Sequence, residues 1–144
     1  MFKHFEHIGM ATADMDACLA FYVGLLGCEL TVRKPSPAGV GEVAFVSIGG
    51  GMLEIVTHPG MQRPAYDVPP DRVGMRHITF NVDDVDAEYA RLLAAGVESA
   101  QPPRDAYKIE LFARVAFVKD PDGVMVELVQ RQPGFTAGRR SGGS

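Results

Sequence analysis

The chain has 144 residues, a hydrophobic content of 47% and a formal net charge of −4. This length fits one domain, or two small modules around a shared core, and the charge gives no support to a nucleic-acid or anionic-membrane partner. No stretch approaches the roughly 20 apolar residues that a membrane-spanning helix needs. The polar N-terminus is unlike a secretory signal, and Cys18 and Cys28, which lack a Cys-x-x-Cys spacing, are interpreted as packing residues of a cytoplasmic protein.

The first half of the chain combines strand-like alternation with one helical segment. A strand is expected over residues 4–12, followed by a helix that Asp14 caps and Gly27 ends. The segment TVRK and a Pro/Gly-rich loop at 35–41 follow, and further strands are predicted for EVAFVSIG and MLEIVT. The expected order is therefore a strand, a helix and then two or three strands.

A proline-rich connector precedes a second series of similar elements. Its prolines favour irregular, extended backbone over residues 59–73. The pattern then restarts with a strand in MRHITFNV and a helix from Asp84 to Gly96. The last predicted element is a hairpin around the turn Asp-Pro-Asp-Gly.

The two halves resemble copies of each other. His7, Ile8 and Asp14 return as His77, Ile78 and Asp84, and MLEIV returns as MVELV. Chance similarity between two amphipathic stretches is the alternative, but the agreement of caps, apolar positions and polar positions favours a repeat. We interpret residues 1–132 as one domain made of modules 4–58 and 74–131, and we expect a flexible tail at 133–144.

The repeat places one histidine and one glutamate in each half: His7 and Glu54, then His77 and Glu127. Because strand side chains alternate, these residues project away from their aliphatic neighbours. A glutamate in the middle of an apolar strand is costly unless its charge is compensated. Two imidazoles and two carboxylates suit one divalent ion, with Zn, Ni, Co, Mn or Fe all compatible. The alternative is that the histidines and glutamates only pair with each other.

Several basic residues are candidates for binding an anionic part of a substrate. They are Arg76, Arg104, Lys108 and Arg114. Arg104 and Lys108, with Tyr107 between them, are expected in a polar loop that could close over a cavity. The alternative is that all of these charges are solvated loop residues.

The βαβββ repeat, with the segments HIGMAT, RHITFNVDDV and FVKDPDGVMVEL, resembles the vicinal oxygen chelate superfamily over residues 4–130. This superfamily includes glyoxalase I, methylmalonyl-CoA epimerase, extradiol dioxygenases and the bleomycin resistance type of drug-binding protein. The resemblance implies an α+β fold. In it, two tandem βαβββ modules form a half-open, barrel-like curved sheet with the helices on the outside.

The resemblance also implies a chemistry. His7, His77 and Glu127 match the ligands of dioxygenases, and Glu54 adds the fourth ligand of glyoxalase I and the epimerases. A metal-dependent lyase or isomerase is expected, which removes an α-proton from a substrate with oxygens on adjacent carbons through an enediolate. By analogy Glu127 is the base, and Glu54 can act on the opposite face. The alternatives are an Fe(II)-dependent extradiol dioxygenase and a non-catalytic protein that binds or sequesters a small molecule.

At two positions this sequence differs from the functional residues of glyoxalase I and of the epimerases. Ala11 stands where bacterial glyoxalase I has an arginine for glutathione. In an ungapped comparison Ala38 stands where the epimerases have a further catalytic glutamate, and Glu42 is close enough for a short gap to align it instead. The substrate therefore stays open. Open sheet edges predict a homodimer, in which the metal is held within one chain or shared between two.

Overall fold

The computed structural model describes residues 1–64, 67–107 and 110–134, and it contains two compact units. The first unit comprises residues up to 66 together with Asp120–Gly123, and the second comprises the rest. Most of the predicted tail, from residue 135 onward, lies outside the described residues. No helix in the described ranges is both long and apolar enough to cross a membrane.

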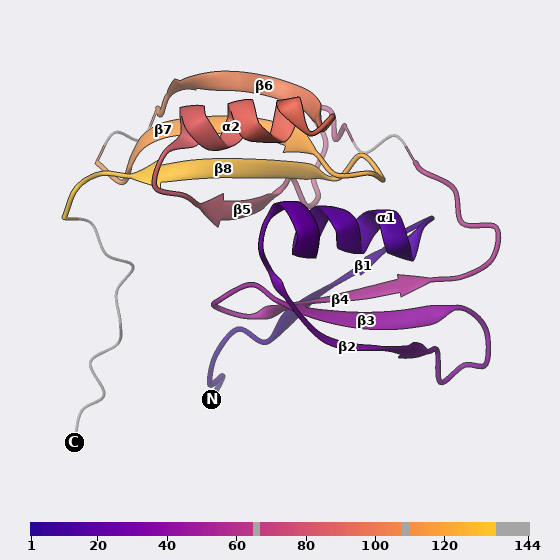
Figure 1. The fold of residues 1–144 in the computed structure, drawn as a ribbon. Helices are drawn as coiled ribbons and strands as arrows, with labels where there is room; N and C mark the ends of the chain where they lie inside the picture. Colours follow the sequence, from indigo (N-terminus) through magenta and orange to yellow (C-terminus); the bar gives the residue numbers. More distant parts are fainter. Residues whose placement is uncertain (65–66, 108–109, 135–144) are drawn as a thin grey trace. The chain divides into compact units, whose positions relative to one another are not determined.

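The first unit is one four-stranded sheet with a helix on one face (Figure 1). The order of the strands in the sheet is β1-β4-β3-β2, with β1 parallel to β4 and the other neighbours antiparallel. The predicted strand–helix–strands order is confirmed. The elements are β1 (His7–Ala11), α1 (Met15–Leu19), η1 (Ala20–Leu25), β2 (Glu29–Pro35), β3 (Glu42–Ser47) and β4 (Met52–Thr57).

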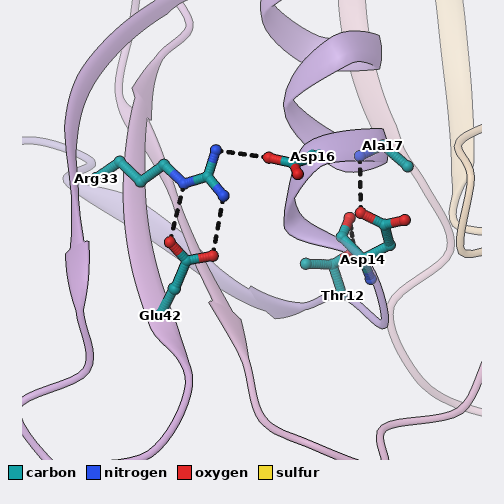
Figure 2. A network of polar contacts seen from close by, with 6 residues as sticks. All are labelled: Thr12, Asp14, Asp16, Ala17, Arg33 and Glu42. Atoms are coloured by element: carbon teal, nitrogen blue, oxygen red, sulfur yellow. Dashed lines mark hydrogen bonds and ion pairs between the residues drawn. The ribbon is translucent and has the colours of Figure 1, made fainter.

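The helix of the first unit begins and ends where the sequence predicts. Asp14 has extended backbone, and its carboxylate accepts a hydrogen bond from Ala17 N at 3.0 Å (Figure 2). Gly27 ends the helical segment with a φ of +75°, which costs glycine little. The second part of the helix, η1, is π-helical. The change from α-helix to π-helix could not be predicted, because the apolar residues of this segment follow the ordinary spacing of an α-helix.

The second unit repeats the arrangement of the first. The order of its strands is β5-β8-β7-β6, again with one parallel pair, β5 and β8. Asp84 caps the helix by accepting from Ala87 N at 3.0 Å, and Gly96 follows it with a φ of +87°. The elements are β5 (Ile78–Asn81), α2 (Val85–Ala94), β6 (Glu98–Asp105), β7 (Phe112–Lys119) and β8 (Met125–Arg131).

Strand β6 is the element that the sequence pattern does not indicate. Its residues, ESAQPPRD, are polar and include two prolines. Such a strand is tolerated because it lies at the edge of the sheet, and its pairing with β7 is irregular around Gln101. Arg104 therefore lies on a strand and not in the expected polar loop, and Lys108 lies outside the described residues.

In both sheets, aliphatic side chains and glutamates alternate between the two faces. Leu53 and Ile55 are fully buried on either side of Glu54, and Val126 and Leu128 are buried on either side of Glu127. The aliphatic residues lie on the face that the helix covers in each unit. Each glutamate is therefore on the opposite face, as the alternation predicts. We call this the ligand face.

Cys18 is expected to be chemically inert in the native protein. It is buried, and burial, followed by the nearby charge of Asp120, raises the pKa of its thiol to about 12. Because the thiolate is the reactive form, iodoacetamide should modify Cys18 only after unfolding, whereas the half-buried Cys28 should react earlier. Peptide mass spectrometry of native and urea-unfolded protein measures both sites. Equal labelling rates of Cys18 in the two states would contradict the expectation.

Candidate metal centre

Each unit brings one predicted histidine next to one predicted glutamate. In the first unit His7, at the start of β1, lies with its Nε2 3.4 Å from Oε2 of Glu54 on β4. In the second unit His77, directly before β5, lies with its Nε2 3.1 Å from Oε2 of Glu127 on β8. The pairs are formed by the same elements of the repeat, a parallel pair of strands in each sheet.

A phenylalanine supports each of these pairs at an equivalent position. Phe45 lies opposite Glu54 in the strand register, and its ring contacts that of His7 edge to face, with centroids 5.9 Å apart. Phe117 lies opposite Glu127 and contacts His77 in the same way at 5.5 Å. Each imidazole is thus held between a ring and a carboxylate, which limits its rotation.

The geometry of each pair fits two ligands of one metal ion. Ligand atoms roughly 2.0–2.2 Å from a metal, at tetrahedral or octahedral angles, lie about 3.0–3.4 Å from each other. The measured 3.4 and 3.1 Å match this spacing, and a neutral imidazole with a carboxylate is a donor set for divalent metals. Within the described ranges no group of three or more His, Cys, Asp or Glu residues is arranged so that it could hold a metal ion. Neither unit therefore completes a site alone, and the four-ligand site stays a prediction.

The two pairs differ in how the glutamate is held. In the second unit the Thr79 hydroxyl donates to Oε2 of Glu127 at 2.8 Å, and the Glu127 side chain is only 16% exposed. In the first unit Gly9 faces Glu54, whose side chain is 36% exposed. A Cβ at Gly9 would lie 3.8 Å from the Glu54 carboxylate, so glycine leaves space beside it. Glu127 is therefore the more firmly oriented carboxylate.

Glu6 contacts the first pair and was missed from sequence. His7 Nδ1 donates to the Glu6 carboxylate, and this hydrogen bond is the largest effect that raises the pKa of His7, partly opposed by desolvation. Because Nδ1 is engaged, Nε2 is the nitrogen directed at Glu54. No pattern signals Glu6, because the corresponding position in the second half is Arg76 and the repeat therefore does not mark it.

Glu42 lies on the wrong face of its sheet to assist either glutamate. It is three residues from Phe45 on β3, so it points to the helix side when Phe45 points to the ligand face. There the Arg33 guanidinium donates to both of its oxygens, at 3.1 and 2.9 Å, and to Asp16 of α1 at 2.7 Å (Figure 2). Glu42 is thus a structural ion-pair partner.

Two of the candidate anion-binding arginines are already engaged. Arg114 pairs with Asp86 at 2.6 Å and with Asp105 at 3.0 Å. Arg76 donates to backbone carbonyls of the connector, including that of Val68 at 2.7 Å. Both guanidinium groups therefore stabilise the fold of the second unit.

A cavity of about 590 Å³ lies on the ligand face of the second sheet. The His–Glu pair of this unit forms part of its wall, together with Thr79. Farther along the sheet the wall is both apolar and basic, with Arg104, Phe112, Val129 and Arg131. The cavity can therefore hold a small organic molecule against the His77–Glu127 pair.

Comparison with known proteins places these features in a family context. The model of the glyoxalase/bleomycin resistance protein/dioxygenase superfamily matches residues 4–128. A lactoylglutathione lyase from Neisseria meningitidis (serogroup A / serotype 4A) is 30% identical over 135 residues, or 89% of this chain and 91% of the relative. The mitochondrial methylmalonyl-CoA epimerase of Homo sapiens is 30% identical over 130 residues, or 87% of this chain and 72% of the relative. A glyoxalase family protein from Enterococcus faecalis has a crystal structure that matches with a TM-score of 0.71 at 29% identity, covering 89% of this chain and 98% of that one.

Proposed function

Because this chain belongs to the glyoxalase/bleomycin resistance protein/dioxygenase superfamily, we propose that it is a divalent-metal-dependent lyase or isomerase of the glyoxalase I or epimerase type. The observation that carries the proposal is the presence of a His–Glu pair at the equivalent place in both units. A dioxygenase needs only three of these four residues. The fourth, Glu54, favours proton-transfer chemistry, and relatives named lyase and epimerase support the same class.

His7, Glu54, His77 and Glu127 would hold the metal ion. A divalent cation held by these residues would supply Lewis acidity that stabilises the negative charge developing on a substrate carbonyl. The donor set is compatible with Zn, Ni, Co, Mn or Fe, so metal identity is a matter for analysis of the purified protein.

Glu127 is the proposed base. Its Oε2 accepts from Thr79 and lies beside His77, while Oε1 accepts no hydrogen bond from any described residue. Oε1 can take the proton from the substrate carbon next to the carbonyl, and the electron pair of the broken C–H bond moves toward the carbonyl oxygen. Return of the proton to the neighbouring carbon gives a lyase-type product, and return to the same carbon gives epimerisation. By analogy with glyoxalase I, Glu54 is the group proposed to act on the opposite face of the substrate.

The proposal is tested by metal analysis together with turnover. Purified protein should contain one divalent ion per site and should convert either a methylglyoxal–thiol hemithioacetal or a 2-methyl-branched acyl thioester. Protein without a stoichiometric metal, or metal-loaded protein inactive on both substrate types, would contradict it. Oxygen uptake with catechols after iron loading would indicate the dioxygenase alternative. Tight binding of a small molecule without turnover, unchanged by Glu127→Gln, would indicate a sequestering protein.

A second experiment decides whether the metal is held within a chain or shared in a homodimer. The variants His7→Ala and His77→Ala each remove one ligand, from different units. If the site is shared, dimers reassembled from a mixture contain one intact site and regain activity. If the site lies within one chain, the mixture stays as inactive as its components.

Thr79→Val should lower kcat by about tenfold, because one hydrogen bond to a charged group contributes roughly 1.5–3 kcal/mol. Valine keeps the shape of threonine but cannot donate to Glu127, so the carboxylate loses its orientation. Thr79→Ser keeps the hydroxyl and serves as the matched control, with activity near that of the wild type. Steady-state kinetics at full metal occupancy measures both variants, and equal kcat values for them would contradict the role of Thr79.

A further inference from the structure

The cavity of the second unit contains two guanidinium groups at a distance from its His–Glu pair. We propose that Arg104 and Arg131 form a subsite for a carboxylate or phosphate at the end of the substrate remote from the reacting carbons. The inference rests on the proposed function, because it takes the His77–Glu127 pair as the reacting end. It names the substrate class as a thiol adduct or thioester whose far end is anionic.

The strand register places both arginines on the ligand face. Arg131 shares the face of Glu127 because the two are separated by an even number of residues on β8. Arg104 on β6 pairs with Val115 on β7, which pairs with Val129 on β8. Both arginines line the same cavity as Glu127.

The spacing along β8 sets the length of the substrate. At about 3.3 Å per residue, Val129 lies roughly 7 Å and Arg131 roughly 13 Å along the strand from Glu127. The cavity wall between these points is uncharged, with Val115, Val129 and Phe112, and with Asn81 beside Val129. A substrate that fits has its reacting carbons at Glu127, an uncharged middle segment and an anion about 7–13 Å away.

Among the described residues, no carboxylate neutralises either guanidinium. Arg131 lies over the Phe112 ring at 5.6 Å, and no carboxylate of the described residues is in salt-bridge range of it. Arg104 lies over the Tyr107 ring at 4.2 Å, and within the described part of the chain its donors reach the Gln101 side-chain oxygen and the Asp105 carbonyl only. Arg114, in contrast, has two carboxylate partners.

This arrangement is suited to anion binding. The aromatic rings restrict the two guanidinium planes, so less side-chain entropy is lost when an anion binds. Arginine can also hold a carboxylate or phosphate through two parallel hydrogen bonds. Two uncompensated positive charges in one half-enclosed cavity therefore favour an anionic ligand over a neutral ligand of the same size.

The test compares matched anionic and neutral ligands by calorimetry on the full-length, metal-loaded protein. One pair is S-propylglutathione and its diethyl ester, which distinguishes a carboxylate. The other is 4′-phosphopantetheine and pantetheine, which distinguishes a phosphate. The anionic member of at least one pair should bind about tenfold or more tightly, the effect of a hydrogen-bonded charge pair. The pair that shows the preference identifies the source of the anion.

Arginine variants assign the preference to the subsite. Arg131→Met should remove most of it, and Arg131→Lys should retain a part, because lysine keeps the charge but not the paired donors. Arg91→Met is the matched control: it removes the same charge from the exposed surface of α2, where Arg91 pairs with Glu88 at 2.7 Å. Equal binding of anionic and neutral ligands by the wild type would overturn the inference. So would a preference that survives in the double variant Arg104→Met/Arg131→Met.

Failure of this inference differs from failure of the proposed function. Glu127→Gln should keep the anion preference, since Glu127 is outside the subsite. If the protein converts a substrate but binds anionic and neutral ligands equally well, only the proposed subsite is overturned. An anion preference in a wild-type protein that converts neither substrate type would support the subsite and contradict the proposed chemistry.

Discussion

Glu127→Gln should lower kcat by about a thousandfold, within the 10²–10⁴-fold range that a positioned general base contributes. The amide that replaces the carboxylate cannot take up the substrate proton. It can still accept the hydrogen bond from Thr79, so the side chain keeps its place on β8 and the fold is retained. Steady-state kinetics, with metal content measured on the same samples, separates loss of the base from loss of the metal.

Two further glutamine variants make this result specific. Glu54→Gln should cost clearly less than Glu127→Gln, because Glu54 is more exposed and has no hydroxyl partner corresponding to Thr79. Glu42→Gln is the matched control. It makes the same chemical change on the helix-covered face of the first sheet, where Glu42 pairs with Arg33. This variant should leave kcat unchanged. A Glu127→Gln variant that retains more than a tenth of wild-type kcat would exclude Glu127 as the base.

The placement of one His–Glu pair in each unit could be predicted, because it depends on strand alternation and on the internal repeat. Alternation along a strand decides the face of Glu54 and Glu127, and the buried neighbours of each residue confirm that prediction. The internal repeat then predicts that the second half places His77 as the first half places His7. The helix caps at Asp14 and Asp84 follow from the same local chemistry. None of this needs knowledge of contacts between distant segments.

The residues that sequence reasoning missed are those whose role depends on distant partners. Arg114 resembled a free loop cation, yet Asp86 and Asp105 neutralise it from α2 and β6. Arg131 drew no attention because only the register of β8 with its neighbours aligns it with Glu127 along one cavity. The polar strand β6, which carries Arg104, has no hydrophobic alternation to reveal it.

The turn Asp-Pro-Asp-Gly shows the same limit most clearly. Its residues were interpreted only as turn formers, but Asp120 and Asp122 are 2% and 5% exposed. Asp122 accepts from the Thr12 hydroxyl at 2.5 Å and from Ala13 N at 2.9 Å. Asp120 accepts from the buried Tyr22 hydroxyl at 2.9 Å and from the backbone N–H of Asp122 at 2.9 Å. The turn therefore anchors the start of the first helix, more than 100 residues away in sequence.

Asp122→Ala should lower the free energy of unfolding by about 3 kcal/mol, since a hydrogen bond to a charged group contributes roughly 1.5–3 kcal/mol and two such bonds are lost. The two donors are the part-buried Ala13 N–H and the Thr12 hydroxyl, which keeps a second acceptor in the Asp14 carbonyl at 3.0 Å, and alanine cannot accept from either. Asp122→Asn keeps the size and one acceptor oxygen, so about half of this loss is expected from it. Asp71→Ala, at a site 79% exposed, is the control and should change stability little. Urea unfolding of the three variants measures the differences. A loss below about 0.5 kcal/mol for Asp122→Ala, the range of ordinary surface substitutions, would show that water replaces the carboxylate and that the turn is no anchor.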